Sequence, residues 1–374
     1  MSSVSKRPDG RYRARYRDAA GVSHAKHFVR KVDAQQWLDS ITASQIRGDY
    51  VDPRSGKVSY REWSESYFAT ATHKRATTLA RDRIVNQRWL LPSLGSRSLA
   101  TIRPADVRNV VATMVEHLAP ATVRTNYGVL RAVLSAAVDA ELIAVSPCRG
   151  VKLPAKRRSE IRFLDADELA RLARETPPEY QPMIYLAGVL GLRWSEVAGL
   201  RVGRVDFLRR TLTVIETCAE VEGRIIFGDV KSPASRRTLS VPSFLIEMLA
   251  EHVAARGRPS PEALLFVAPN GGPLRRSTFR TRVFDPAARR AGIDGVTFHA
   301  LRHTAVALMI EAGAHIEAIK QRLGHSSIRV TSDVYGSLLP TVDESVTAAL
   351  DARFIHLGPS ASQSAKSRRH RPSR

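Results

Sequence analysis

The sequence has few cysteines and no long hydrophobic segment. Cys148 and Cys218 are the only cysteines in 374 residues, and they lie far apart. This argues against a cysteine-based metal site and is typical of a reduced compartment. No apolar run approaches the roughly 18 residues of a membrane-spanning helix, and the polar N-terminus lacks the apolar core of a signal peptide. We therefore expect a cytoplasmic protein without a membrane partner.

Acidic residues are in deficit. Lys and Arg number 58 against 36 Asp and Glu, which gives a formal net charge of +22 and a pI near 10.8. Such an excess favours a polyanionic partner, and nucleic acid is the leading candidate. An anionic membrane surface is the alternative, but we find no basic amphipathic helix with an aromatic face. We therefore expect a nucleoid-associated protein, and the length and 43% hydrophobic content allow two or three folded domains.

Arginine alternates with other residues near the N-terminus, where residues 10–18 read GRYRARYRD. Strict alternation is the period of a β-strand, so one face carries the guanidinium groups and the other carries Tyr12, Ala14 and Tyr16. Such a row of cations could bind a polyanion, and the alternative is a strand face that is simply exposed to water. The members of this arginine face are Arg11, Arg13, Arg15 and Arg17.

Residues 1–57 are predicted to form a small domain and a linker. After the arginine strand we expect a turn at 18–21, a strand at 22–29 and a helix at 33–47, capped by Asp33 and ended by Gly48. On that helix Trp37, Leu38 and Ile41 would face the sheet. Residues 52–57, DPRSGK, are typical of a linker.

Residues 58–146 have the pattern of an all-helical domain. We expect helices at 59–71, 77–91, 104–117 and 120–140, with Pro104 and Pro120 in first helical turns. Residues 147–160 are predicted to be a second linker. Its cations Lys156, Arg157 and Arg158 are candidates to lie along a phosphate backbone.

Residues 161–354 give a mixed pattern, mainly helical with a small antiparallel sheet. Helices are expected at 165–175, 182–190 and 195–200, strands at 211–216, 224–230 and 237–241, and further helices after them. Residues 355–374 are expected to form a basic disordered tail. The predicted fold class is therefore multidomain α+β.

Short stretches of this third region carry side chains suited to phosphate chemistry. In GLRWSE the carboxylate of Glu196 can reach back to donors around Arg193, although a cap and a solvated arginine are the plainer reading. In HALRHT, His299 and Arg302 lie three apart and share a helical face. The alternative there is a core histidine and a surface arginine. Zinc is a poor choice because HALRH lacks the glutamate of HExxH.

A lysine and a tyrosine complete the candidates. Lys231 lies in a segment, 230–242, that is predicted to be a tight hairpin with SPAS as its turn, from which it could reach DNA and donate a proton. Tyr335 follows a predicted helix at 327–334, and its phenol can be a covalent nucleophile when cations or a base lower its pKa. The alternatives to these catalytic roles are a solvated lysine on the surface and a tyrosine that packs in a core.

In this order, these stretches resemble the tyrosine recombinase or phage integrase family. Arg193 matches the first arginine of the GxRxxE box, and Glu196 matches its acidic position. The remaining matches are the β-hairpin lysine, Lys231, the HxxR pair, His299 and Arg302, the third-box histidine, His325, and the nucleophile ten residues later, Tyr335.

The resemblance implies a site-specific recombinase that needs neither a metal nor ATP. It implies a three-stranded arm-type DNA-binding domain at 1–57 with the arginine face in a major groove, a core-binding domain at 58–146 and a catalytic domain at 161–354. The implied partners are core-type and arm-type sites on double-stranded DNA, a homotetramer, a DNA-bending host factor and a directionality factor. The expected terminal helix at 341–354 would dock on a neighbouring protomer or on its own domain.

Two other functions remain open at this point. A type IB topoisomerase shares the chemistry but relaxes DNA without joining partner sites. A noncatalytic DNA-binding regulator would need only the first two domains.

Overall fold

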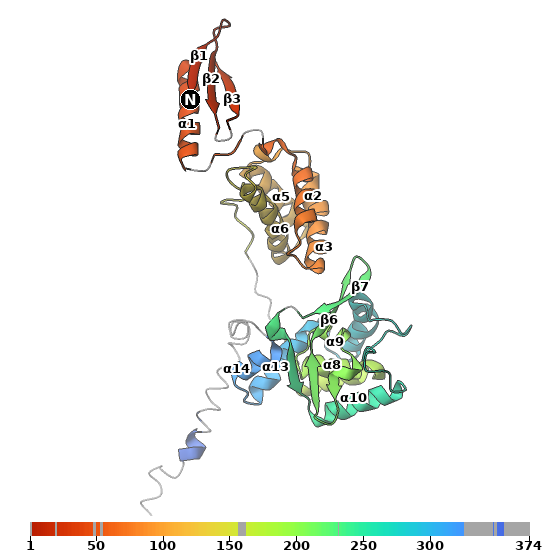
Figure 1. Cartoon of the computed structure of the whole chain (residues 1–374). Coiled ribbons are helices and arrows are strands. Elements are labelled where there is room, and N and C mark those ends of the chain that lie inside the picture. The colour runs from red at the N-terminus through yellow and green to blue at the C-terminus, as the bar shows by residue number, and fades with distance from the viewer. Residues whose placement is uncertain are drawn as a thin grey trace, which may run out of the picture. The chain divides into compact units, whose positions relative to one another are not determined.

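The computed structural model describes residues 2–18, 21–47, 50–52, 55–155, 162–230, 232–324, 347 and 350–354. The chain has a mixed α+β fold and divides into two compact units, Met1–Ser159 and Glu160–Arg374 (Figure 1). Within these ranges, no helix is both long enough and apolar enough to cross a bilayer.

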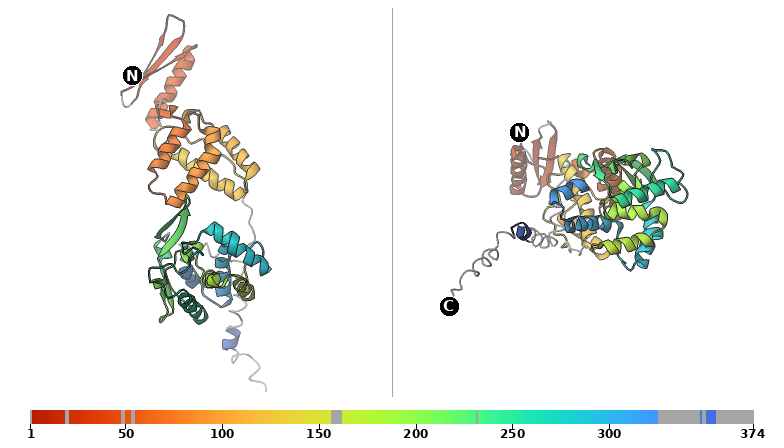
Figure 2. Two further views of the ribbon diagram at one scale, coloured as in Figure 1. Left: turned by 90° about the vertical axis from the view of Figure 1, so that its right-hand side faces the viewer. Right: turned by 90° about the horizontal axis from the view of Figure 1, so that it is seen from below.

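The N-terminal part of the first unit is a three-stranded antiparallel sheet covered by one helix. The strands are β1 (Ser3–Lys6), β2 (Tyr12–Arg17) and β3 (Ser23–Phe28), in the order β1-β2-β3, and α1 (Lys31–Arg47) lies along one face (Figure 2). Ala14 and Tyr16 are buried against α1, and Trp37, Leu38 and Ile41 join them. The predicted alternation and the sheet-facing side of the helix are both confirmed.

The predicted start of α1 is wrong by two residues. Asp33 does not cap the helix; its carboxylate lies in the first turn and accepts hydrogen bonds from Arg30 Nε at 3.0 Å and Nη2 at 2.9 Å. A carboxylate there is stabilised by the helix dipole without being the cap, which explains the misplacement. Gly48, the predicted end, lies outside the described residues.

The remainder of the first unit is all helical. Its helices are α2 (Tyr60–Thr70), α3 (Ala76–Val85), α4 (Leu91–Leu94), α5 (Pro104–His117) and α6 (Pro120–Asp139). Pro104 and Pro120 occupy first helical positions as predicted. The helix predicted at 77–91 instead continues from α3 through a π-helical turn, Asn86–Leu90, into α4.

The linker predicted at 52–57 is partly wrong. Residues Ser55–Lys57 form a 3₁₀ turn in which Gly56 is buried. An added Cβ at Gly56 would lie 2.8 Å from both Ala100 Cβ and Leu142 O, and Ser98 Oγ donates to Gly56 O at 2.7 Å. The turn therefore packs on the helical core, because glycine has no side chain and allows a close approach. The polar, loop-like composition of residues 52–57 does not reveal this packing.

The second unit is built mainly of helices around α8, which is buried along most of its length. The predicted helices at 165–175, 182–190 and 195–200 are confirmed to within two residues. The helices are α7 (Ala166–Glu175), α8 (Gln181–Gly188), α9 (Trp194–Ala198), α10 (Ser243–Ala255), α11 (Arg276–Phe279), α12 (Asp285–Arg290), α13 (Phe298–Glu311) and α14 (Ile316–Leu323).

The strands of this unit form two small antiparallel sheets. One has the order β4-β5-β8, with β4 (Val205–Asp206), β5 (Thr211–Val214) and β8 (Arg237–Ser240). The other is the hairpin of β6 (Glu216–Val221) and β7 (Arg224–Asp229), which extends from the helical body of the unit (Figure 1).

The hairpin predicted at 230–242 is therefore wrong. β7 pairs with β6 through a two-residue turn at Glu222 and Gly223, whose φ angles of 49° and 77° are those of a tight hairpin turn. β8 pairs with β5, where Leu239 lies opposite Leu212 and both are buried. Burial of these leucines, which adjacency in sequence does not reveal, decides the pairing.

Candidate active site

The first arginine of the predicted site begins α9. Arg193 is the N-cap residue, and its backbone N–H donates to Glu196 Oε2 at 2.9 Å while its Nη1 donates to Oε1 at 2.8 Å. The predicted reach of the carboxylate back to Arg193 is confirmed. Glu196 is 2% exposed and Arg193 is 34% exposed, so one end of this pair is buried and the other reaches the surface.

Glu196 is held in its ionised form. Burial alone would raise the pKa of its carboxyl group, but hydrogen bonds and charge from Arg237, and then from Arg193, lower that pKa overall. The carboxylate therefore remains an acceptor at neutral pH.

Arg302 is buried in α13 and ties three segments together. It is 3% exposed, and it donates from Nη1 to Gly191 O and from Nη2 to Leu323 O at 2.7 Å. The alternative of a surface arginine is therefore wrong. Leu301 and Ala305 are also fully buried, so the helix is buried on more than one side.

Gly191 makes this arrangement possible. Its φ is +72°, a conformation that side chains disfavour, and an added Cβ would lie 2.4 Å from Leu323 Cδ2. Its carbonyl accepts from Arg302, and Arg193 follows two residues later. The glycine of the GxR stretch thus places one arginine relative to the other.

His299 lies in the first turn of α13, after the cap formed by Thr297, whose Oγ1 accepts from the N–H of Ala300 at 3.3 Å. Its ring is 5.1 Å from that of His303, edge to face. Although His299 retains an exposed surface, partial desolvation and then the charges of Arg302, Arg193 and Arg276 lower its pKa. Desolvation, then His299 and Arg302, lower the pKa of His303 to about 4. Both rings are neutral at pH 7.

Three of the six predicted catalytic residues lie outside the described part of the chain, namely Lys231, His325 and Tyr335. The same holds for the linker cations Lys156, Arg157 and Arg158. Described neighbours of two of them come together. An added Cβ at Gly324, the residue before His325, would lie 2.8 Å from Ala234 O, which belongs to the 3₁₀ turn Pro233–Ser235 that follows Lys231.

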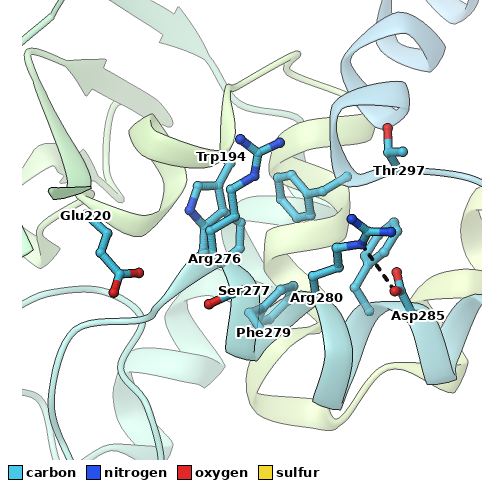
Figure 3. Close-up of a pocket in the computed structure, with 10 residues that line it drawn as sticks. Trp194, Glu220, Arg276, Ser277, Phe279, Arg280, Asp285 and Thr297 are labelled. Atoms are coloured by element: carbon cyan, nitrogen blue, oxygen red, sulfur yellow. Dashed lines mark hydrogen bonds and ion pairs between the residues drawn. The ribbon is translucent and has the colours of Figure 1, made fainter. Parts of the chain in front are cut away.

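A pocket of about 360 Å³ is lined by Trp194, the residue after Arg193, and by Thr297 and Phe298, which precede His299 (Figure 3). Its aromatic wall includes Trp194, whose ring is 4.9 Å from Phe279 and 5.2 Å from Phe298. Arg276 and Arg280 lie on its exposed rim, and Arg280 is paired with Asp285 at 3.2 Å. The carboxylates of Glu220 and Asp285 also line the pocket, so its lining carries charges of both signs.

One group of described residues has the composition of a metal site, and it lies in the first unit. Asp18, His24 and Asp52 place one ligand atom each within 4.8 Å of one another. However, His24 Nε2 lies 2.8 Å from Asp18 Oδ2, a hydrogen bond that uses this nitrogen, and the His24 ring stacks on Tyr16 at 4.9 Å. These contacts account for the cluster as a structural network.

Comparison with known proteins identifies the family of the chain. The model of the phage integrase family matches residues 162–340. An integrase of Mycobacterium phage FRAT1 is 30% identical over 318 residues, which cover 80% of this chain and 92% of the phage protein. The chain belongs to the phage integrase family of tyrosine recombinases. It is therefore a site-specific DNA recombinase, an enzyme that transfers DNA strands.

Solved structures share the fold of this integrase. The integrase of transposon Tn1549, in complex with transposon right end DNA, has a TM-score of 0.64 at 20% identity and covers 74% of this chain and 95% of its own. A lambda integrase tetramer bound to a Holliday junction has a TM-score of 0.55 at 16% identity, covering 87% and 95%. At these identities the similarity concerns the fold alone.

The structure also shows an arginine that the sequence analysis missed. Arg237, in β8, is 6% exposed and donates to Glu196 from Nη2 at 2.9 Å and from Nη1 at 3.2 Å. The signal was present, because Arg237 shares the inward face of its strand with Leu239 and Val241, which are both buried. An arginine in such a series requires an internal partner.

We predict that Gly191→Ala reduces DNA cleavage by at least about tenfold. The alanine pays the cost of a positive φ, roughly 1–2 kcal/mol, and its Cβ displaces Leu323 and with it the acceptor of Arg302. The measurement is the single-turnover rate of covalent cleavage of a nicked duplex.

Gly292→Ala is the matched control for this prediction. Gly292 has the same φ of +72° but no atom within 4 Å of its added Cβ, so it carries the backbone cost without the collision. Equal cleavage rates in the two variants would contradict the role given to Gly191.

Proposed function

We propose that this recombinase cleaves DNA by attack of the Tyr335 phenol on a phosphate held by Arg193 and Arg302. The observation that carries the proposal is the link between the two arginines: Arg302 donates to the carbonyl of Gly191, two residues before Arg193, and both arginines act on the pKa of His299. Two guanidinium groups can neutralise the charge that develops on non-bridging oxygens.

In the proposed step, the phenol oxygen of Tyr335 forms a bond to phosphorus while the bond from phosphorus to the 5' oxygen breaks. His299 assists removal of the phenol proton, Lys231 protonates the leaving 5' oxygen, and His325 hydrogen-bonds the phosphate. The product is a 3'-phosphotyrosyl link and a free 5' hydroxyl. Attack by the 5' hydroxyl of a partner strand reverses the step and exchanges strands.

The proposed chemistry needs neither a metal nor ATP. The arginines supply the charge that a cation would otherwise supply, and the phosphotyrosyl link conserves the energy of the phosphodiester. A type IB topoisomerase would share this step, but the family match and the integrase relatives favour recombination over relaxation, and equally over a noncatalytic regulator.

We further propose that four copies assemble on two duplexes, with residues 58–146 on the core-type site and Lys156, Arg157 and Arg158 along its backbone. The tetramer of lambda integrase on a Holliday junction supports this assembly. Leu350 and Phe354, in a described helical part of segment 341–354, are about half exposed (49% and 53%), and we propose that they dock on a neighbouring protomer. A DNA-bending host factor, a directionality factor and a cytoplasmic, nucleoid-associated location complete the proposal.

The N-terminal sheet is proposed to bind an arm-type site through its arginine face, which lies opposite α1. The partners of Arg15 across the sheet are Ser3 and Ala25, so small side chains flank the arginine and leave room for a DNA backbone. Arg13 lies between Ser5 and His27, and within the described chain its Nε is buried without a hydrogen-bond partner. A base edge in the major groove would supply acceptors for the terminal nitrogens of arginines on this face.

The first test is covalent trapping. Wild type and Tyr335→Phe are incubated with nicked duplexes drawn from DNA flanking the gene and resolved on a denaturing gel. We expect a shifted band with wild type alone, because only the phenol can form the adduct. A band that persists in the variant would assign the nucleophile elsewhere.

The pKa of His299 predicts the acid limb of the cleavage rate. Partial desolvation, and then neighbouring cations, hold this pKa below its usual value, so the neutral ring persists as pH falls and the rate should decline only below the usual pKa of a histidine. Arg276→Gln removes one cation, raises the pKa of His299 and should move the limb to higher pH. A limb that stays in place would contradict this assignment.

Arm-site binding is tested with Arg13→Ala and Arg15→Ala. Each should weaken protection of the arm-type site by roughly 5- to 100-fold, the effect of losing one good base contact, while core-site cleavage persists. Arg30→Ala is the control, because Arg30 lies outside the sheet strands and pairs with Asp33. Unchanged footprints in both test variants would refute the role of the arginine face.

A further inference from the structure

Arg237 lies where three segments of the second unit meet. Its Nη1 and Nη2 donate to the two oxygens of Glu196, its Nε donates to Arg322 O at 2.8 Å, and Nη1 also donates to Ser235 O at 2.9 Å. The guanidinium group therefore contacts the first turn of α9, the 3₁₀ turn Pro233–Ser235 and the last turn of α14.

Each of these segments adjoins a residue of the proposed mechanism. Glu196 binds Arg193 directly. Ser235 lies four residues after Lys231, and Arg322 lies three residues before His325. One buried side chain thus connects the neighbourhoods of three catalytic residues that are far apart in sequence.

The charged side chains Arg193, Glu196 and Arg237 differ in their exposure to solvent. Glu196 and Arg237 are 2% and 6% exposed and form a two-pronged ion pair, whereas Arg193 is 34% exposed. Two positive groups share one negative group, which leaves one net positive charge, on the arginine that reaches the surface. If Arg237 were absent, the single carboxylate would neutralise Arg193.

We propose that Arg237 is a positioning residue that keeps the charge of Arg193 available to the scissile phosphate by neutralising Glu196, and that anchors the chain next to Lys231 and His325 through Ser235 and Arg322. This inference rests on the proposed contact between Arg193 and the phosphate. A lysine cannot replace the arginine, because a planar fork is needed to reach both carboxylate oxygens and two carbonyls together.

The test compares two nicked duplexes that carry the core site. One has a normal scissile phosphate, and the other has a methylphosphonate there, in which a methyl group replaces a non-bridging oxygen and removes the charge. Single-turnover cleavage and DNA affinity are measured for full-length wild type, Arg237→Gln and Arg237→Lys, with thermal unfolding as the check of folding.

We expect Arg237→Gln to cleave the normal phosphate roughly 10- to 100-fold more slowly than wild type. Its DNA affinity should change less than about threefold, because the buried side chain does not reach the DNA. On the methylphosphonate, its deficit relative to wild type should shrink to less than about threefold, since the negative charge of the diester is gone and the transition state carries one charge fewer. Arg237→Lys keeps the positive charge, so its rate of cleavage of the normal phosphate should lie between those of wild type and Arg237→Gln.

Arg236→Gln is the matched control. Arg236 is the next residue in the chain, is exposed, and pairs only with Asp229 at 3.5 Å among the ion pairs of the described residues, so its loss should leave cleavage within about threefold of wild type. If Arg237→Gln fails to fold, the double variant Glu196→Gln/Arg237→Gln, which has no unpaired buried charge, replaces it. Because no carboxylate then remains to neutralise Arg193, its deficits on the two substrates should agree within about threefold, and a much larger deficit on the normal phosphate would overturn the electrostatic role.

Equal deficits of Arg237→Gln on both substrates would overturn the electrostatic role of Arg237, and an unimpaired Arg237→Gln variant would overturn the inference altogether. Failure of the wild type to form any adduct would instead overturn the proposed function. The two failures are therefore distinguishable in one set of reactions.

Discussion

The arrangement of the site depends on the carboxylate of Glu196, which is shared between a buried arginine and a partly exposed one. A buried ion pair loses its water, and it is tolerated only where its hydrogen-bonding groups find partners inside the protein. Here every nitrogen of the Arg237 guanidinium donates to a protein oxygen, and both oxygens of Glu196 accept. The desolvated pair is thereby made compatible with the interior, and the turn that begins α9 is fixed as a consequence.

Arg302 solves a similar problem with backbone carbonyls in place of a carboxylate. Its two terminal nitrogens donate to the carbonyls of Gly191 and Leu323, one of which precedes Arg302 in the sequence while the other follows it. Both arginines act as planar cross-links between loops, a role that suits a group with several donors in fixed directions. The site is consequently a junction of loops and helix ends, held by guanidinium groups, and no single helix or strand carries it.

The sequence predicted helices more successfully than strand pairing, for a physical reason. Pro104, Pro120 and Asp165 mark helix starts through local chemistry, and all three stand at the first turn or cap of the observed helices. Strand pairing is decided by burial of residues distant in sequence, so the partner of β8 was assigned wrongly. The π-helical turn at Asn86–Leu90 likewise has no local signature that we recognised.

Of the predicted catalytic residues, the structure describes Arg193, His299 and Arg302, and it shows supporting contacts that the sequence does not predict. Spacing placed His299 and Arg302 on one face, yet it could not show that α13 is buried around Arg302, since that burial comes from the Gly191 turn and from α14. The roles of Lys231, His325 and Tyr335 come from family resemblance, and these residues remain predictions. Arg237 could have been recognised from its inward position in a strand, had the orientation of that strand been known.

The polar network of Asp18, His24 and Asp52 shortens the connection between the N-terminal sheet and the helical part of the first unit. The hydroxyl groups of Tyr16 and Tyr50 lie 2.9 Å apart and Asp52 lies 3.7 Å from His24, so the chain stays attached to the sheet as far as Asp52. The helical core begins at the turn Ser55–Lys57. Three peptide steps, about 10 Å of extended chain, therefore separate the two anchored parts. Under the proposed binding of one DNA segment by each part, this short connection raises the effective concentration of one part around any DNA that lies near the other. Two DNA segments that are far apart would then be joined by bending the DNA, because the connection cannot lengthen.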